Sequence, residues 1–198
     1  MVCNGRRNYR QPGAQSTRGA TLFPDFLGKT HRPISMKIAI LSDVHDNVSN
    51  LLTALYYAEK QHCTHLLYLG DIAEVSTLRV LLDSWNHPAD IVFGNNEYDL
   101  RAHTELVQQY PLACHHGDEG TLCLQGRRIY ISHYPRNAFI AADCGDYDAV
   151  FYGHTHVAEQ RQHRQTLVAN PGEVGGIRRL PGFGVYDTAI NEMSIHPL

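Results

Sequence analysis

Long apolar runs are absent from this chain of 198 residues. No segment approaches the roughly 20 apolar residues that span a bilayer, and the first thirty residues lack the apolar stretch of a secretory signal. The five cysteines are odd in number and show no paired spacing, which argues against a disulfide framework. Charged residues are also few, at 19%, beside 43% apolar residues. These features predict a cytoplasmic, globular protein without a membrane partner.

The basic and acidic residues are unevenly distributed. Residues 1–35 hold six of the 17 basic groups and one of the 20 acidic groups, so residues 36–198 carry 11 basic and 19 acidic groups, a net charge of −8. An acidic body argues against extended nucleic-acid binding, which needs a positive surface. The 13 histidines are many for this length, and histidine is the commonest metal ligand in proteins.

The composition changes near residue 35. Residues 1–35 mix Gly, Pro, Arg, Gln and Ser without a sustained period, and we expect a disordered or loosely attached N-terminal arm. A mitochondrial presequence is an alternative, although no clear amphipathic helix supports it. Met36 stands directly before the first strand, so a start codon read too far upstream is another explanation. Residues 36–198 are predicted to form one folded domain.

From residue 37 onward, short apolar strands alternate with helical patterns. The first half predicts strands and helices in turn, at 37–42, 48–61, 65–69, 75–85 and 90–93. This alternation favours a parallel sheet covered by helices, in which ligands bind beyond the carboxyl ends of the strands. The second half predicts a hairpin, a helix and five further strands, at 121–124 with 128–132, 135–144, 148–152, 158–162, 166–169, 183–188 and 192–195. Together they indicate two stacked sheets with helices outside.

A polar cluster follows five of these strands, and the clusters are Asp43-Val44-His45, Gly70-Asp71, Gly94-Asn95-Asn96-Glu97, His133 and Gly153-His154-Thr155-His156. Singly, each cluster also fits an ordinary turn, a helix cap or a strand-end histidine. Their placement favours a shared site, because all five clusters can meet on one rim of the sheet. Carboxylate, amide and imidazole donors suit Mn, Fe, Zn or Mg better than thiolate-preferring ions, and no cluster contains cysteine.

This ordered series resembles the calcineurin-like metallophosphoesterase family, and within it the small single-domain phosphodiesterases of bacteria and archaea. The likeness covers about residues 36–198 and includes Asn170-Pro171-Gly172. It implies an α/β fold, a four-layer α/β/β/α sandwich of two mixed sheets flanked by helices. It also implies two divalent metal ions, with Mn favoured and Fe, Zn, Ni or Mg as alternatives. The implied ligands are Asp43, His45 and His156 for the first ion, Asn95, His133 and His154 for the second, and Asp71 as the bridge.

The activity implied by the resemblance is hydrolysis of phosphodiester bonds in a small phosphate ester, by a hydroxide that bridges the two ions. Two divalent ions outweigh the charges of two aspartates and a hydroxide, so an acidic protein can still attract an anion there. Phosphomonoester hydrolysis on the same centre is one alternative. A non-catalytic scaffold like the retromer subunit of this family is another, although a scaffold need not keep all seven ligands. A homo-oligomer stays open.

One position departs from the best-known family pattern. A histidine usually follows the metal-binding asparagine, whereas this chain has Asn96, which donates a hydrogen bond but cannot transfer a proton at neutral pH. Asp71 and Asn96 are the predicted catalytic residues. Arg178 and Arg179 fit either phosphate contacts or a solvated loop, and Glu173 stands where many relatives carry a small residue. These last three are not among the predicted site residues.

Overall fold

The structure, a computed structural model, describes residues 35–198. The arm predicted for residues 1–35 lies outside this range except for Ser35. The described residues form eleven strands and four helices. The helices are α1 (Val48–Lys60), α2 (Val75–Ser84), α3 (Leu100–Val107) and α4 (Pro135–Cys144). No helix among the described residues combines the length and apolar character needed to cross a membrane.

The first sheet has six strands in the order β11-β10-β1-β2-β3-β4. Strands β1 to β4 run parallel to one another, as the strand–helix alternation predicts, while β10 and β11 join as an antiparallel hairpin. The bounds are β1 (Lys37–Leu41), β2 (Cys63–Tyr68), β3 (Ala89–Ile91), β4 (Ala113–His115), β10 (Gly182–Asp187) and β11 (Glu192–Pro197).

The second sheet has five strands in the order β5-β6-β7-β9-β8. Its three central strands are parallel, and the edge strands β5 and β8 pair antiparallel with their neighbours. The bounds are β5 (Glu119–Leu124), β6 (Arg127–Ser132), β7 (Ala149–Phe151), β8 (Glu159–His163) and β9 (Thr166–Asn170). Both sheets are therefore mixed, with parallel strands at their centres.

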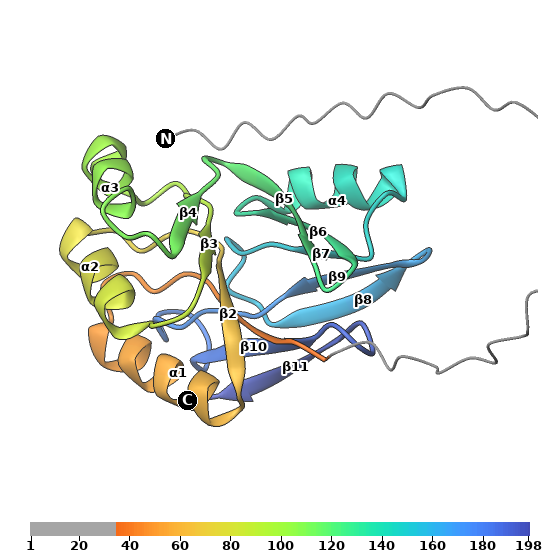
Figure 1. Cartoon of the computed structure of the whole chain (residues 1–198), viewed down its shortest axis with the longest axis horizontal. Coiled ribbons are helices and arrows are strands. Elements are labelled where there is room, and N and C mark those ends of the chain that lie inside the picture. Colours follow the sequence, from red (N-terminus) through yellow and green to blue (C-terminus); the bar gives the residue numbers. More distant parts are fainter. Residues whose placement is uncertain (1–34) are drawn as a thin grey trace, which may run out of the picture. The chain divides into compact units, whose positions relative to one another are not determined.

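Three apolar clusters separate four layers. One packs α1 and α2 against the outer face of the first sheet, a second lies between the sheets, and a third packs α4 against the second sheet. Figure 1 shows α1, α2 and α3 on one side of the paired sheets and α4 on the other. The predicted α/β/β/α sandwich is confirmed. Two short elements, α3 and β4, were not predicted from the sequence.

A charged cluster joins β2 and β3 with His116, the residue that directly follows β4. Both carboxylate oxygens of Asp90 accept hydrogen bonds from histidine Nε2 atoms, one from His65 and one from His116, each at 2.7 Å. Burial of Asp90 favours its neutral form, but these two donors outweigh burial and lower its pKa to about 2. The side chain of Asp90 therefore stabilises the fold in its ionised form.

We expect Asp90→Asn to lower the free energy of unfolding by about 2 kcal/mol at pH 7, because one histidine loses its acceptor. Because folding lowers the pKa of Asp90 from an ordinary 3.8 to about 2, its stabilisation is complete above about pH 4 and is lost as the pH falls through 2. Urea titrations of both proteins at several pH values measure this difference. A difference that stays constant down to pH 2 contradicts the explanation.

Candidate metal centre

The predicted site residues follow the carboxyl ends of parallel strands in both sheets. Backbone hydrogen bonds join the loops to one another: Asp43 N donates to Gly70 O at 3.0 Å, and Gly153 N donates to His133 O at 3.1 Å. The two sheets are also joined here, since Gly175 N donates to Asp43 O at 2.9 Å. The rim expected from the strand order is therefore one connected structure.

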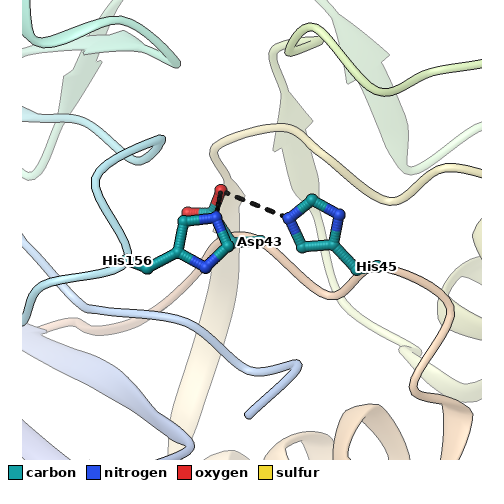
Figure 2. A group of neighbouring side chains, drawn as sticks. All are labelled: Asp43, His45 and His156. Carbon is teal, nitrogen blue, oxygen red and sulfur yellow. Dashed lines mark ion pairs between the residues drawn. The ribbon is translucent and has the colours of Figure 1, made fainter. Parts of the chain in front are cut away.

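The first group of predicted ligands is Asp43, His45 and His156. The Oδ1 atom of Asp43 lies 3.9 Å from His45 Nε2 and 3.5 Å from His156 Nε2. The two imidazole rings stack with their centroids 5.1 Å apart. Figure 2 shows the three side chains pointing toward one another. The potential ligand atoms of this group all lie within 4.8 Å of one another.

The second group contains Asp71, Asn95, His133 and His154. The His133 Nε2 atom lies 3.2 Å from Asn95 Oδ1, 3.2 Å from His154 Nδ1 and 3.4 Å from Asp71 Oδ1. Asp71 lies between the two groups, because its Oδ2 is 3.7 Å from His45 Nε2. All seven predicted ligands are therefore brought together.

Two buried atoms of the first group have no hydrogen-bond partner among the described residues: Asp43 Oδ1 and His45 Nε2. Burial raises the pKa of Asp43, as expected for a carboxylate that lacks a neutralising partner. Unpaired buried polar atoms are costly, and a carboxylate oxygen facing an imidazole nitrogen is the donor set of a divalent cation. The residues present therefore fit a metal ion.

Hydrogen bonds on the far side of two rings leave the inner nitrogens available. His133 Nδ1 lies 2.7 Å from Leu69 O, so this nitrogen carries the proton and donates it to the carbonyl. His156 Nδ1 lies 2.7 Å from Glu173 Oε2 and donates in the same way. In the neutral rings the Nε2 atoms therefore carry lone pairs directed toward the site, as metal-binding histidines require.

Electrostatics favour the ionised form of Asp71. Burial opposes ionisation, but the protonated form of the His133 ring, 3.4 Å away, and hydrogen bonds from Asn96 outweigh it and hold the pKa of Asp71 well below its ordinary value. Burial lowers the pKa of His133, but the interaction with the Asp71 carboxylate outweighs burial and raises this pKa above its ordinary value. Burial of His154 lowers the pKa of that ring.

A third group with metal-binding side chains is Asp90, Cys114 and His116. It differs from the two groups above, because the Asp90 carboxylate already accepts two hydrogen bonds at 2.7 Å. None of its atoms is among the unpartnered buried atoms of the described residues. The internal hydrogen bonds of this group are sufficient to explain it, and it needs no ion.

Five of the seven predicted ligands have a positive φ angle: Asp43 (54°), His45 (45°), Asp71 (64°), His154 (68°) and His156 (62°). This left-handed region is uncommon for residues other than glycine, although Asn, Asp and His enter it more readily than others. Such conformations cluster at functional sites, where the surrounding structure holds them in place. The loops are therefore shaped for the convergence of these side chains.

Gly94 and Gly153 permit close contact between loops. A Cβ atom on Gly94 would lie 2.2 Å from Asp71 Oδ1, and one on Gly153 would lie 1.9 Å from Ser42 Oγ. Both separations are far below van der Waals contact, so any larger residue would displace the side chains around the predicted ligands.

Glu97 contributes hydrogen bonds that its place in the sequence motif did not predict. Its Oε1 accepts from Asp71 N at 2.8 Å, and its Oε2 accepts from Gly94 N at 2.8 Å. This buried carboxylate joins the loops after β2 and β3 and holds Asp71 in place. Its position in the Gly94–Glu97 cluster was the available sequence signal.

Two adjoining pockets open at the site. The smaller, of about 200 Å³, is lined by six predicted site residues together with two residues of a later loop, Ile177 and Arg178. The larger, of about 910 Å³, is a broad groove lined by Val157, Ala158 and residues 176–181. Ile177 and Arg178 line both pockets, so the groove continues from the site.

Comparisons with known proteins agree with this geometry. Residues 36–190 match the family described as the calcineurin-like phosphoesterase superfamily domain. The phosphodiesterase MJ0936 of Methanocaldococcus jannaschii is 28% identical over 162 residues, which cover 79% of this chain and 96% of the relative. A solved archaeal phosphodiesterase superposes with a TM-score of 0.77 at 26% identity, covering 82% of this chain and 100% of that one.

A more distant structural neighbour is Vacuolar Protein Sorting 29 from Cryptosporidium parvum, with a TM-score of 0.58 at 15% identity and coverage of 82% of this chain and 96% of that one. That likeness shows the fold alone. The family match confirms the resemblance carried by the five polar clusters. The chain therefore belongs to the calcineurin-like phosphoesterase superfamily and is, by that membership, a hydrolase of phosphate esters.

Proposed function

We propose that this protein hydrolyses phosphodiesters with two divalent metal ions, Mn²⁺ first among them. Asp43, His45 and His156 would hold one ion. Asn95, His133 and His154 would hold the other, and Asp71 would bridge the two. The observation that carries the proposal is the pair of buried, unpartnered atoms, Asp43 Oδ1 and His45 Nε2. When bound, two such ions activate water as a nucleophile and neutralise charge on the phosphate oxygens.

The chain's own residues prepare the site for this chemistry. Asp71 Oδ1 accepts hydrogen bonds from the backbone amides of Asn95 and Asn96 at 2.8 and 2.9 Å, and its Oδ2 accepts from Asn96 Nδ2 at 2.6 Å. These bonds fix the carboxylate before any ion binds, so little reorganisation is needed. An amide nitrogen has two N–H groups, so Asn96 keeps one donor for a phosphate oxygen.

The shape of the surface favours a diester over a monoester. The small pocket at the predicted ligands is large enough for a phosphate group, and the adjoining groove has room for an organic substituent on it. Apolar side chains project along the groove, with exposed fractions of 39% for Val157, 60% for Ile177 and 90% for Leu180. A phosphodiester carries one ester group that leaves and a second that stays on phosphorus, so it can contact the groove through an organic group besides the leaving group, whereas a monoester has only its leaving group.

Turnover of bis(4-nitrophenyl) phosphate and of 4-nitrophenyl phosphate by the Mn²⁺-loaded protein tests this preference. We expect kcat/KM to be at least about tenfold higher for the diester, because the diester has a second ester group that can contact the groove in addition to the leaving group. Equal or faster turnover of the monoester would show a phosphomonoesterase instead. Failure to turn over either ester, in protein that binds two equivalents of metal, would contradict the proposed function altogether.

A further inference from the structure

Glu173 is a fully buried carboxylate surrounded by four hydrogen-bond donors. It follows β9, and none of its surface is exposed. Its Oε2 accepts from His156 Nδ1 at 2.7 Å and from the backbone amide of Ile177 at 2.9 Å. Its Oε1 accepts from the backbone amide of Arg178 at 2.6 Å and from that of Arg179. A buried charge is costly unless it is well paired, and here four donors compensate it.

One of these four contacts, with His156, involves a predicted metal ligand. Because the Glu173 carboxylate accepts the proton on His156 Nδ1, it fixes both the tautomer and the rotation of the ring. The opposite nitrogen, His156 Nε2, then points toward Asp43 Oδ1 at 3.5 Å. Carboxylates behind metal-binding histidines raise ligand basicity and hold the ring in place, and their loss costs about 10–100-fold in metal affinity.

The other contacts shape the loop at 176–181. The three successive amides of residues 177–179 converge on one carboxylate, as backbone amides do around a bound anion. The turn into this segment passes through Gly176, which has a φ of 71°. At its far end Gly182 N donates to Glu173 O at 2.9 Å, which closes the loop. The loop is thus folded around Glu173.

The shape of this loop decides what faces the site. Arg178 lines the small pocket together with the predicted ligands and also lines the groove, whereas Arg179 lines the groove alone. The structure therefore places Arg178, and not Arg179, beside the position proposed for the phosphate. Guanidinium groups bind phosphate oxygens through paired N–H donors.

We propose that Glu173 is a positioning residue that sets two parts of the site at once: it orients His156 for the metal, and it folds the loop that presents Arg178 to the phosphate. This inference rests on the proposed function, because both metal binding and phosphate binding belong to it. The orientation of His156 also has a consequence for the metal-free protein, namely that His156 carries its proton on Nδ1.

Nitrogen NMR of the metal-free protein at pH 8 reports the tautomer of each histidine, with His156→Gln used to assign the signal. We expect the Nδ1–H form for His156. An Nε2–H form would overturn the proposal, whether or not the protein proves to be a phosphodiesterase. This measurement needs no variant of Glu173, so it stands even if such variants fold poorly.

Calorimetry of Mn²⁺ binding to Glu173→Gln tests the effect of Glu173 on the metal site. Glutamine offers one acceptor oxygen to four donors, so we expect Mn²⁺ to bind about 10–100-fold more weakly at one of the two sites, with the other site unchanged. Glu192→Gln, an exposed change on β11, is the matched control and should leave both affinities as in the wild type. Wild-type affinity at both sites of a folded Glu173→Gln variant would overturn the proposal.

The effect of Glu173 on the loop that presents Arg178 is tested with inorganic phosphate as a competitive inhibitor of diester hydrolysis. Arg178→Gln should raise the inhibition constant by about tenfold without changing Mn²⁺ affinity, and Arg179→Gln, its matched control, should change neither. Glu173→Gln should raise both the phosphate inhibition constant and the metal dissociation constant. Equal effects of the two arginine changes would show that the loop does not select Arg178. If the wild type hydrolyses no diester, phosphate binding to the Mn²⁺-loaded protein is measured directly.

Discussion

Asp71→Asn should lower kcat for a phosphodiester by about 10³-fold or more in the Mn²⁺-loaded protein. The carboxylate of Asp71 lies near both groups of predicted ligands, with Oδ2 at 3.7 Å from His45 Nε2 and Oδ1 at 3.4 Å from His133 Nε2. An amide in its place has no charge to offset the repulsion between two neighbouring cations. We therefore expect at most one tightly bound ion per chain.

The variant should still fold. An asparagine oxygen can accept one of the backbone hydrogen bonds that Asp71 now accepts from Asn95 and Asn96. Its metal-free form should unfold at a lower temperature than the wild type, because the low pKa of Asp71 means that the fold favours the ionised carboxylate. Circular dichroism, thermal unfolding and metal analysis separate these effects.

Asp146→Asn is the matched control for this change, because Asp146 is exposed and lies 3.9 Å from Arg128, away from the site. It should alter neither kcat nor metal content. Asp71→Asn protein that holds two ions and keeps more than about a tenth of wild-type kcat would contradict the bridging role.

The order of the polar clusters made the site predictable from the sequence. Each cluster directly follows a short apolar strand, and parallel strands bring their carboxyl ends to one edge. The strand order and the types of side chain predicted a metal site at this rim, and the family resemblance of the ordered clusters implied the individual ligands. The prediction reached residues such as Asp43 and His133, which are buried and could also have been ordinary strand-end residues.

The two missed elements have weak sequence signals. Helix α3 is eight residues long, and its buried face consists of His103, Leu106 and Val107, so one of its three core positions is a polar residue. Strand β4 has only three residues, at the edge of the first sheet, and all of them are half-buried. Hydrophobic periodicity cannot distinguish such segments from loops.

The supporting carboxylates were beyond prediction for a different reason. Glu97 and Glu173 accept hydrogen bonds from nearby backbone amides and also from donors that are distant in the sequence, such as Asp71 N and His156 Nδ1. No spacing rule identifies an acceptor of that kind. The positive φ angles of the ligands are likewise a property of the assembled loops, which the residue types permit but do not require.

A large effect is also expected on the step in which the leaving alcohol receives a proton. Asn96 lines the small pocket, and its Nδ2 donates to Asp71 Oδ2 at 2.6 Å. An amide can donate a hydrogen bond to a phosphate oxygen, but it has no proton to transfer at neutral pH. A leaving group of high pKa should therefore depart slowly, because it must leave as an alkoxide or take its proton from water.

We expect kcat to fall steeply from aryl to alkyl phosphodiesters, and we expect Asn96→His to reverse part of that fall. An imidazole can act as a general acid near neutral pH, and such catalysis contributes about 10²–10⁴-fold. The alkyl diester should gain about 10²-fold, whereas the aryl diester, whose leaving group needs no proton, should change little. A series of diesters with graded leaving-group pKa values measures this as the slope of log kcat.

Asn96→Gln is the matched control, since it keeps an amide and should keep the steep slope. A flat slope in the wild type would contradict the role assigned to Asn96 and would require another acid at the site. His154 is exposed and lies beside the same pocket, so Asn96→His must be compared at equal metal content to exclude a change in ligation. If the steep slope is found, the acidity of the leaving group determines which diesters this enzyme can hydrolyse at a useful rate. The groove then limits which organic groups can bind at the site. The lack of a proton donor at Asn96 limits hydrolysis to diesters whose leaving group is acidic.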